Sequence, residues 1–228
     1  MLFIFQNTAV TTGLHDALVT ESQRGQNKAI IRGFVFKRAF DVVFSMMVVV
    51  FLLSWLIPLI ALIIKMESKG PTFFKQLRTG KDGNPFYCLK FRSMTVNADA
   101  DIQRACKGDC RVTKVGYFLR KTSLDEFPQF INVLKGEMSV VGPRPHMLRH
   151  TQEYSQAIDN FMDRHTIMPG ITGLAQVCGH RGEIKEPENI AQRVKADIHY
   201  IHNWSFLLDL KIVILTVCRL AQNDEKAY

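Results

Sequence analysis

The feature that most constrains the fold is an uncharged run of 23 residues from Val42 to Ile64. As an α-helix this run would be about 35 Å long at 1.5 Å per residue, enough to cross the hydrocarbon core of a bilayer. A simple transmembrane helix therefore fits the run. A segment that enters the membrane and returns to the same side fits it as well.

Two details of this run bear on that choice. Pro58 removes the hydrogen bond to the Ser54 carbonyl and kinks the helix, and the Ser54 hydroxyl is a local partner for the freed carbonyl. Basic residues at both ends give a spanning helix no preferred orientation, whereas a segment returning to its starting side would show this arrangement. From the residues alone, the two topologies are equally supported. The flanking cations are Lys37, Arg38, Lys65, Lys69, Lys75, Arg78 and Lys81.

The charge and the cysteines limit the class of protein. A formal net charge of +8 indicates anionic partners, such as nucleic acid, anionic lipid or phosphorylated substrates. The five cysteines have no disulfide-like spacing, so a reduced, cytosolic environment is expected. Cys106 and Cys110 have no matching second pair, so we expect no zinc site. His146 and His150 are predicted to lie on a solvated helix face.

Two β-rich segments, 72–78 and 86–92, flank a turn whose Asp82-Gly83 step is typical of a β-hairpin. Because side chains alternate between the faces of a strand, Lys90 and Arg92 are predicted to share one face. Two cations on one face suit an anionic ligand. From the residues alone, however, an ordinary hairpin with a solvated basic face is the favoured interpretation.

The adjacent carboxylates Asp125 and Glu126 have both a structural and a chemical interpretation. Ser123-x-x-Glu126 is a capping box, which predicts a helix over Leu124–Leu134 with Asp125 in its first turn. This structural role alone accounts for the residue types. The same position also suits catalysis, because a carboxylate at a helix start stays ionised as a nucleophile and the exposed amides can receive phosphate oxygens.

Two arginines flank this carboxylate pair. Arg120 precedes Asp125 by five residues, and Arg144 lies in a Pro143-Arg144-Pro145 turn. The prolines stiffen the turn and reduce the entropy lost in presenting a guanidinium group. Arginine can bind phosphate oxygens through two parallel hydrogen bonds, which lysine cannot reproduce.

The last third of the chain contains a glycine-rich region, 168–183, and an apolar segment, 204–220. Glycine-rich loops allow the backbone to approach phosphates closely, although the pattern is weak by itself. The apolar segment is either a buried core element or a helix at the bilayer surface with Trp204 at headgroup level.

Taken in order, these motifs resemble the bacterial sugar transferase family of monotopic phosphoglycosyl transferases. The resemblance covers about residues 34–228 and implies an α+β, mainly helical fold with a β-hairpin and a C-terminal interfacial helix. It divides the chain into a flexible leader at 1–33, a re-entrant membrane helix at 34–69 and a cytosolic catalytic domain at 70–228. The re-entrant topology is therefore favoured over the spanning helix.

The resemblance also implies an activity and roles for individual residues. Such enzymes transfer hexose-1-phosphate from a UDP-hexose to undecaprenyl phosphate, which initiates exopolysaccharide, capsule or O-antigen synthesis. The Arg181-Gly182-Glu183 ending resembles members that use glucose or galactose. The resemblance makes Asp125 the nucleophile and Glu126 a ligand of Mg²⁺. The implied phosphate and substrate contacts are Lys90, Arg92, Arg120, Arg144, Gln176 and Arg181.

The implied setting is the cytosolic face of the bacterial inner membrane, in contact with membrane lipid. The alternative from another class is a non-catalytic, membrane-anchored scaffold that binds anionic lipid. A nucleic-acid-binding protein is disfavoured, because the chain has a membrane segment and no recognition-helix or stacking motif. The sequence leaves open both a monomer and a homo-oligomer.

Overall fold

The computed structural model describes residues 33–96, 108–180 and 187–221. The predicted leader therefore lies outside the described residues, except for Gly33. The chain divides into two units, Met1–Phe40 and Asp41–Tyr228, and the described part of the first unit is helical. Mainly helical structure with two small sheets makes up the second unit, which confirms the predicted fold class at this level.

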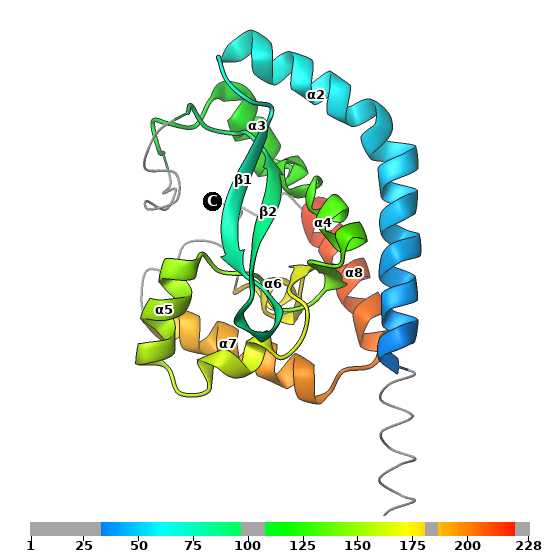
Figure 1. The fold of residues 1–228 in the computed structure, drawn as a ribbon, viewed down its shortest axis with the longest axis vertical. Coiled ribbons are helices and arrows are strands. Elements are labelled where there is room, and N and C mark those ends of the chain that lie inside the picture. The colour runs from blue at the N-terminus through cyan, green and yellow to red at the C-terminus, as the bar shows by residue number, and fades with distance from the viewer. Residues whose placement is uncertain (1–32, 97–107, 181–186, 222–228) are drawn as a thin grey trace, which may run out of the picture. The chain divides into compact units, whose positions relative to one another are not determined.

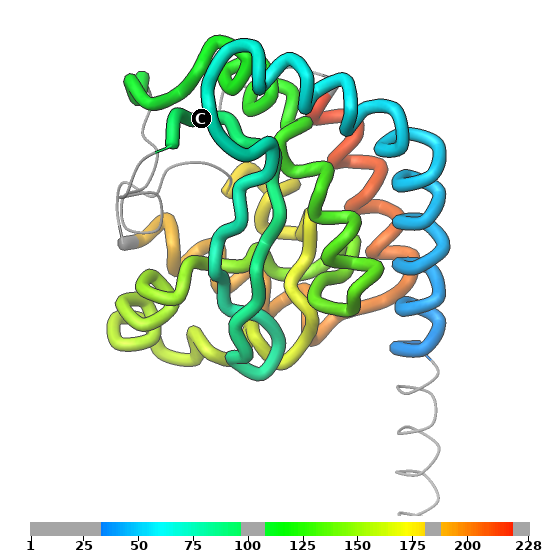
Figure 2. The backbone as a smooth tube through the Cα atoms, turned by 45° about the horizontal axis from the view of Figure 1, so that its top comes forward, coloured from blue at the N-terminus to red at the C-terminus, as the bar shows by residue number. Residues whose placement is uncertain are grey.

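One apolar helix, Gly33–Glu67, is long enough to cross a membrane. It includes a π-helical segment, η1 (Val49–Leu53), followed by α2 (Ser54–Glu67). Figures 1 and 2 show the helix changing direction over η1 and the start of α2. A π-helical segment and the missing hydrogen bond at Pro58 are both recognised causes of such a bend.

The Ser54 hydroxyl does not have the predicted partner. It donates to the Val50 carbonyl at 2.6 Å, one turn earlier, and so supports η1 and not the carbonyl freed by Pro58. The predicted break in the helix is thus present as a bend. Return of the segment to the same side of the membrane stays a prediction.

One side of α2 packs on the rest of the unit. Four residues at spacings of three and four, Leu53, Leu56, Ile60 and Ile64, form a core cluster with Phe91 and Leu119. Burial of one such aliphatic side chain contributes roughly 1.5–3 kcal/mol. The other side of the helix is apolar but exposed, as expected for a helix in contact with lipid. Its exposed residues are Trp55, Leu59, Leu62, Ile63 and Met66.

The predicted hairpin is confirmed. Strands β1 (Phe73–Thr79) and β2 (Pro85–Phe91) pair antiparallel around the short 3₁₀ turn η2 (Lys81–Gly83). Asp82 has φ 54° and Gly83 has φ 80°, the left-handed conformation that an Asp-Gly step supplies at low cost.

The predicted helix Leu124–Leu134 is wrong in its first half. Helix α3 (Lys114–Lys121) is followed by a 3₁₀ turn, η3 (Leu124–Glu126), and then by α4 (Gln129–Lys135). Pro128 occupies the N-cap of α4, so the α-helix begins after it. Ser123 has a left-handed backbone with φ 57° and makes no side-chain capping bond, so the capping box is not formed.

A second, parallel pairing joins segments that are far apart in the sequence. Strand β3 (Ser139–Val141) pairs with β4 (Gly170–Thr172). Between them lie the Gly142–Pro145 turn, α5 (Leu148–Ala157) and the 3₁₀ turn η4 (Phe161–His165). A Cβ on Gly142 would stand 2.5 Å from the Met168 carbonyl oxygen, so glycine is needed for this close approach.

Three helices complete the fold: α6 (Leu174–Val177), α7 (Pro187–His202) and α8 (Phe206–Ala221). The buried carboxylate of Asp209 fixes the corner between α7 and α8. It accepts hydrogen bonds from the Tyr200 hydroxyl at 2.6 Å and from Trp204 Nε1 at 3.1 Å. The predicted helix 204–220 is confirmed, while its place at the bilayer surface stays a prediction.

Candidate functional site

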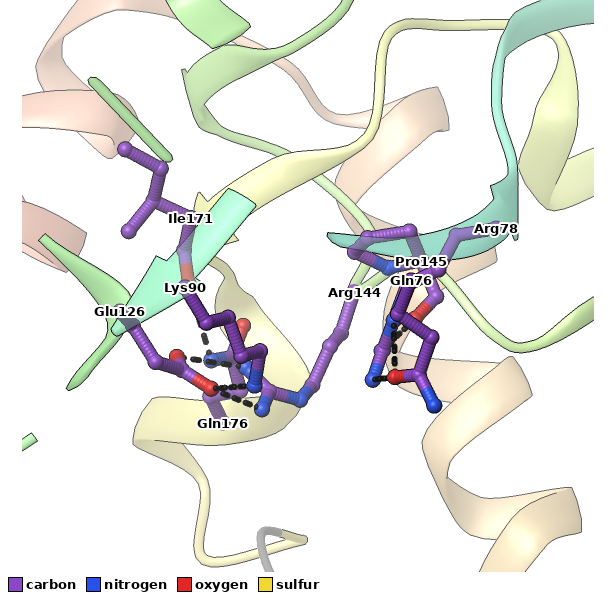
Figure 3. Close-up of polar contacts among 8 residues, drawn as sticks. All are labelled: Gln76, Arg78, Lys90, Glu126, Arg144, Pro145, Ile171 and Gln176. Carbon is purple, nitrogen blue, oxygen red and sulfur yellow. Dashed lines mark hydrogen bonds and ion pairs between the residues drawn. The ribbon is translucent and has the colours of Figure 1, made fainter. Parts of the chain in front are cut away.

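The candidate site is built around the carboxylate of Glu126, which joins three separate segments (Figure 3). Lys90 Nζ on β2 donates to its Oε1 at 2.7 Å. The guanidinium of Arg144, in the turn after β3, donates to Oε2 at 3.0 Å and to Oε1 as well. One carboxylate therefore binds two cations, and the three side chains together carry a net positive charge.

Lys90 reaches Glu126 because of its place on β2. Phe86 and Cys88 are buried on the same face of the strand, while Tyr87 on the other face is exposed. The side-chain alternation predicted for the second strand therefore points Lys90 inward, against η3. Its side chain is 15% exposed and that of Glu126 11%, so the interaction is largely shielded from water.

Asp125 lies beside this cluster and is itself buried. Burial raises the pKa of its carboxyl group to about 6, and the charge of Glu126 acts in the same direction. The cations Lys90, Arg120 and Arg144 limit the rise. The predicted reason for the ionisation of Asp125, its position at the start of an α-helix, is wrong. A single 3₁₀ turn replaces the helix start, and neighbouring cations keep the group ionised above pH 6.

The charge of Arg144 is permanent. Glu126 raises the pKa of its guanidinium above the ordinary value, against the opposing effect of burial. Its side chain is 22% exposed, twice as much as that of Glu126. The guanidinium group is therefore more accessible to an incoming anion than the Glu126 carboxylate is.

Arg120 and Gln176 complete the predicted site residues that the structure brings together. Arg120 lies in the last turn of α3, and its charge acts on Asp125. Gln176 Nε2 donates to the Ile171 carbonyl at 3.2 Å, which fixes the orientation of its amide (Figure 3). Its Oε1 is buried and has no hydrogen-bond partner within the described ranges.

The structure places Arg92 elsewhere. It follows the last residue of β2, and its guanidinium donates to the carbonyl oxygens of Ser68, at 2.7 Å, and Lys69. These carbonyls lie at the end of α2, so Arg92 caps that helix and does not share the site with Lys90. Arg181 lies outside the described residues.

Arg78 was not predicted to support the site. It donates to the Pro145 carbonyl at 2.6 Å, and Gln76 Oε1 accepts from its Nε and NH2 atoms (Figure 3). The available signal was the spacing of Gln76 and Arg78 by two residues, which puts both on one face of β1. In the sequence, Arg78 stood out only as one of several cations flanking the membrane segment.

The prediction of a solvated His146 is wrong. The ring is buried against Phe161, with centroids 5.8 Å apart, and Nδ1 lies 2.9 Å from Arg164 NH1. Burial and the charge of Arg164 lower its pKa well below the ordinary value. Because arginine can only donate, Nδ1 of the neutral ring accepts.

The described residues hold no group of three or more histidine, cysteine, aspartate or glutamate side chains placed to bind a metal ion. Of the cysteine pair, Cys110 is exposed, while Cys106 lies outside the described residues. Asp125 and Glu126 offer two carboxylates. Mg²⁺ usually takes one or two protein carboxylates and completes its shell with water and substrate phosphates, so this pair fits a metal that binds together with a phosphorylated substrate.

In chemical terms, the site combines a buried carboxylate with an excess of positive charge. Lysine and arginine donors at this position can hold the oxygens of a phosphate or diphosphate. Asp125 is poorly solvated, and a desolvated carboxylate is a more reactive nucleophile than a hydrated one. The arrangement therefore suits displacement at phosphorus by a carboxylate.

Comparison with known proteins agrees with this chemistry. The family model described as bacterial sugar transferase matches residues 32–223. A Klebsiella pneumoniae protein named UDP-glucose:undecaprenyl-phosphate glucose-1-phosphate transferase is 52% identical over 184 residues, which cover 80% of the chain. Relatives of the same name in Escherichia coli K12 and Caulobacter vibrioides are 51% identical over 182 residues and 48% identical over 189, covering 79% and 82% of the chain.

These relatives differ in length from the chain. The matched region spans 39% of the Klebsiella and Escherichia proteins and 70% of the Caulobacter protein.

Proposed function

The chain belongs to the bacterial sugar transferase family, and from this premise we propose that it transfers glucose-1-phosphate from UDP-glucose to undecaprenyl phosphate. The observation that carries the proposal is the Lys90–Glu126–Arg144 cluster next to the buried Asp125. The names of three relatives favour glucose over galactose as the hexose. The product would initiate exopolysaccharide, capsule or O-antigen synthesis.

The first step is an attack by Asp125 on the β-phosphorus of the UDP-sugar. A bond forms between the carboxylate oxygen and phosphorus, and the bond from phosphorus to the bridging oxygen breaks. UMP leaves with that oxygen, and an aspartyl phosphosugar remains. Lys90 and Arg144 neutralise charge on the phosphoryl oxygens, which is the main contribution a protein makes to such a transfer.

The second step returns the enzyme to its starting state. A phosphate oxygen of undecaprenyl phosphate attacks the same phosphorus, and the Asp125 carboxylate leaves. Since UMP departs before the lipid reacts, the kinetics should be ping-pong. The pKa of about 6 keeps Asp125 ionised, both as nucleophile and as leaving group, at neutral pH.

Glu126 has two roles in this scheme. In the ligand-free protein it neutralises Lys90 and Arg144. A diphosphate would compete for these cations and release the carboxylate. Glu126 would then hold Mg²⁺, which when bound neutralises the charge of the diphosphate, and Asp125 would stay available for the attack. Substrate and metal should therefore bind more tightly together than separately.

The site is proposed to act at the cytosolic face of the inner membrane. The exposed apolar side of α2 and the basic residues around the helix support this location. With a re-entrant topology, single cysteines at the two ends of the segment 42–64 should be labelled from the same side of intact cells. Labelling from opposite sides would instead establish a spanning helix.

A non-catalytic scaffold that binds anionic lipid is the second candidate. The net charge of +8 and the exposed apolar residues on α2 favour it. Binding of anionic lipid by a scaffold does not, however, require a buried carboxylate beside Lys90, Glu126 and Arg144.

The test is a panel of UDP-sugars incubated with undecaprenyl phosphate, Mg²⁺ and the purified protein, with UMP release as the readout. UDP-glucose should support turnover, and Asp125→Asn should abolish it. Absence of UMP release with every sugar, together with retained binding to anionic vesicles, would establish the scaffold instead.

A further inference from the structure

The turn that carries Arg144 is fixed in an unusual way. Proline has no N–H group, so Pro143 and Pro145 cannot donate hydrogen bonds to hold it. The turn is held through its carbonyl oxygens. Four consecutive carbonyls, those of residues 143–146, each accept a hydrogen bond from another segment: from Gly170 N at 2.9 Å, Arg164 NH2 at 2.8 Å, Arg78 NH1 at 2.6 Å and Thr79 N at 2.9 Å.

Two of these four donors are arginine side chains. One arginine precedes the turn in the sequence and the other follows it. Arg78 comes from β1 and is held by Gln76. Arg164 comes from η4 and binds the carbonyl of Arg144 itself. The main chain of the residue proposed to bind the diphosphate is thus anchored directly by a second guanidinium group.

Arg164 is in turn held by two side chains, those of Asp197 and His146. Its Nε and NH2 atoms donate to Asp197 Oδ2 on α7 at 3.0 and 2.6 Å, and NH1 donates to His146 Nδ1. The side chains of Arg164 and Asp197 are only 1% and 2% exposed. A guanidinium group this buried does not contact substrate, so it acts on the reaction only through the groups that it holds, and of these Arg144 is the one in the candidate site.

We propose that Arg164, anchored by Asp197, is a positioning residue that holds Arg144 in its phosphate-binding orientation through the Arg144 main-chain carbonyl. The inference rests on the proposed function for its kinetic consequences. The geometric claim, that the turn is ordered by this guanidinium group, is independent of the activity.

The kinetic test is a double-mutant cycle. Arg164→Lys keeps the charge but loses the planar fork that reaches three acceptors. We expect about a 10-fold loss of kcat/KM in the wild-type background, and less than about a twofold further loss in an Arg144→Lys background. Losses that multiply in the double variant would contradict the inference, because Arg164 would then act independently of Arg144.

Two matched controls separate positioning from general destabilisation. Arg149→Lys makes the same chemical change in an exposed ion pair on α5 and should leave kcat/KM unchanged. Ile190→Ala removes buried side-chain volume beside Phe161 and leaves the four hydrogen bonds to the turn in place. At matched thermal stability, Ile190→Ala should retain more activity than Arg164→Lys; equal losses would contradict a positioning role.

A second readout does not depend on catalysis. Hydrogen–deuterium exchange of peptides covering residues 139–147 should increase in Arg164→Lys and stay unchanged in Ile190→Ala. If Arg164→Lys does not fold, Asp197→Asn loosens the same guanidinium group and should give the same exchange pattern. Unchanged exchange at the turn in a folded variant overturns the inference. If the wild-type protein releases no UMP but the variants show these differences in exchange, only the proposed function is overturned.

Discussion

Among the described residues, two of the shielded charge clusters use similar groups in different ways. In the first cluster, Lys90 and Arg144 meet Glu126, and the three side chains are 11–22% exposed. In the second, Arg164 meets Asp197, and both side chains are at most 2% exposed. The first has more positive than negative charge and is the proposed site of phosphate binding. The second is closed to ligands.

The difference in exposure distinguishes a cluster that can bind a ligand from one that supports the fold. A partly open cation pair can exchange its carboxylate partner for a phosphate at little cost, since the charges stay compensated throughout. A closed pair has no such alternative, and loss of one partner leaves a buried charge unpaired. Substitutions in the first cluster should therefore change activity more than stability, and substitutions in the second should do the reverse.

The largest expected effect is on turnover by Asp125→Asn. The amide is nearly isosteric but cannot form the aspartyl phosphosugar, so turnover should fall on the order of 1000-fold or more, as when other catalytic nucleophiles are removed. The assay is UMP release. Turnover close to that of the wild type would remove Asp125 from the reaction.

The same variant should be more stable than the wild type, and increasingly so as pH rises. The pKa of Asp125 is raised in the folded protein from 3.8 to about 6. Its contribution to stability is therefore full below about pH 4 and is lost as pH rises through 6. By pH 8 the buried charge should cost about 1–3 kcal/mol. Thermal melts of both proteins at pH 5 and pH 8 measure the difference; a melting temperature of Asp125→Asn at or below that of the wild type at pH 8 would contradict it.

The contrast between the clusters is tested directly by Asp197→Ala and Lys90→Met. The first leaves Arg164 buried and unpaired and should destabilise the fold by about 3–5 kcal/mol. The second leaves Glu126 paired with Arg144, so its stability loss should stay within about 1 kcal/mol while UMP release falls markedly. Equal losses of melting temperature in the two variants would break the distinction.

The smallest predicted effect is a gain in UDP affinity when a residue of the candidate site is substituted. Because Glu126 competes with phosphate for Lys90 and Arg144, Glu126→Gln should strengthen binding of UDP in the presence of EDTA by about fivefold, or roughly 1 kcal/mol. Glu153→Gln, in the exposed pair with Arg149, is the matched control and should change nothing. Weaker UDP binding by Glu126→Gln would mean that the carboxylate does not occupy the phosphate site.

Local chemistry determined which features could be predicted from the sequence. The hairpin was predictable because Asp82 and Gly83 supply the turn by themselves, and the direction of Lys90 followed from alternation along one strand. The start of the helix at 124–134 was predicted incorrectly, because the prediction followed the capping pattern and did not take Pro128 as the residue before the helix. Arg92 and Lys90 were expected together, yet Arg92 lies just past the end of the strand, where the end of α2 supplies carbonyl acceptors.

The features that the sequence did not predict depend on contacts between distant segments. β3 and β4 are short, and only the folded chain brings them into register. Arg164 and Asp197 are 33 residues apart and belong to different elements. Nothing in the spacing of the prolines reveals that two arginines hold the turn between them through its carbonyls. Sequence patterns thus pointed to several residues of the candidate site, but not to the residues that hold them in place.

The central claim is that Asp125 carries the phosphosugar between the two substrates. The most direct measurement is mass spectrometry of the protein after incubation with UDP-glucose and Mg²⁺ in the absence of undecaprenyl phosphate. A covalent route through Asp125 predicts an added hexose-phosphate mass on the peptide that contains Asp125, absent in Asp125→Asn and removed when the lipid is supplied. An unmodified peptide in a protein that turns over, with kinetics requiring both substrates bound together, would contradict it.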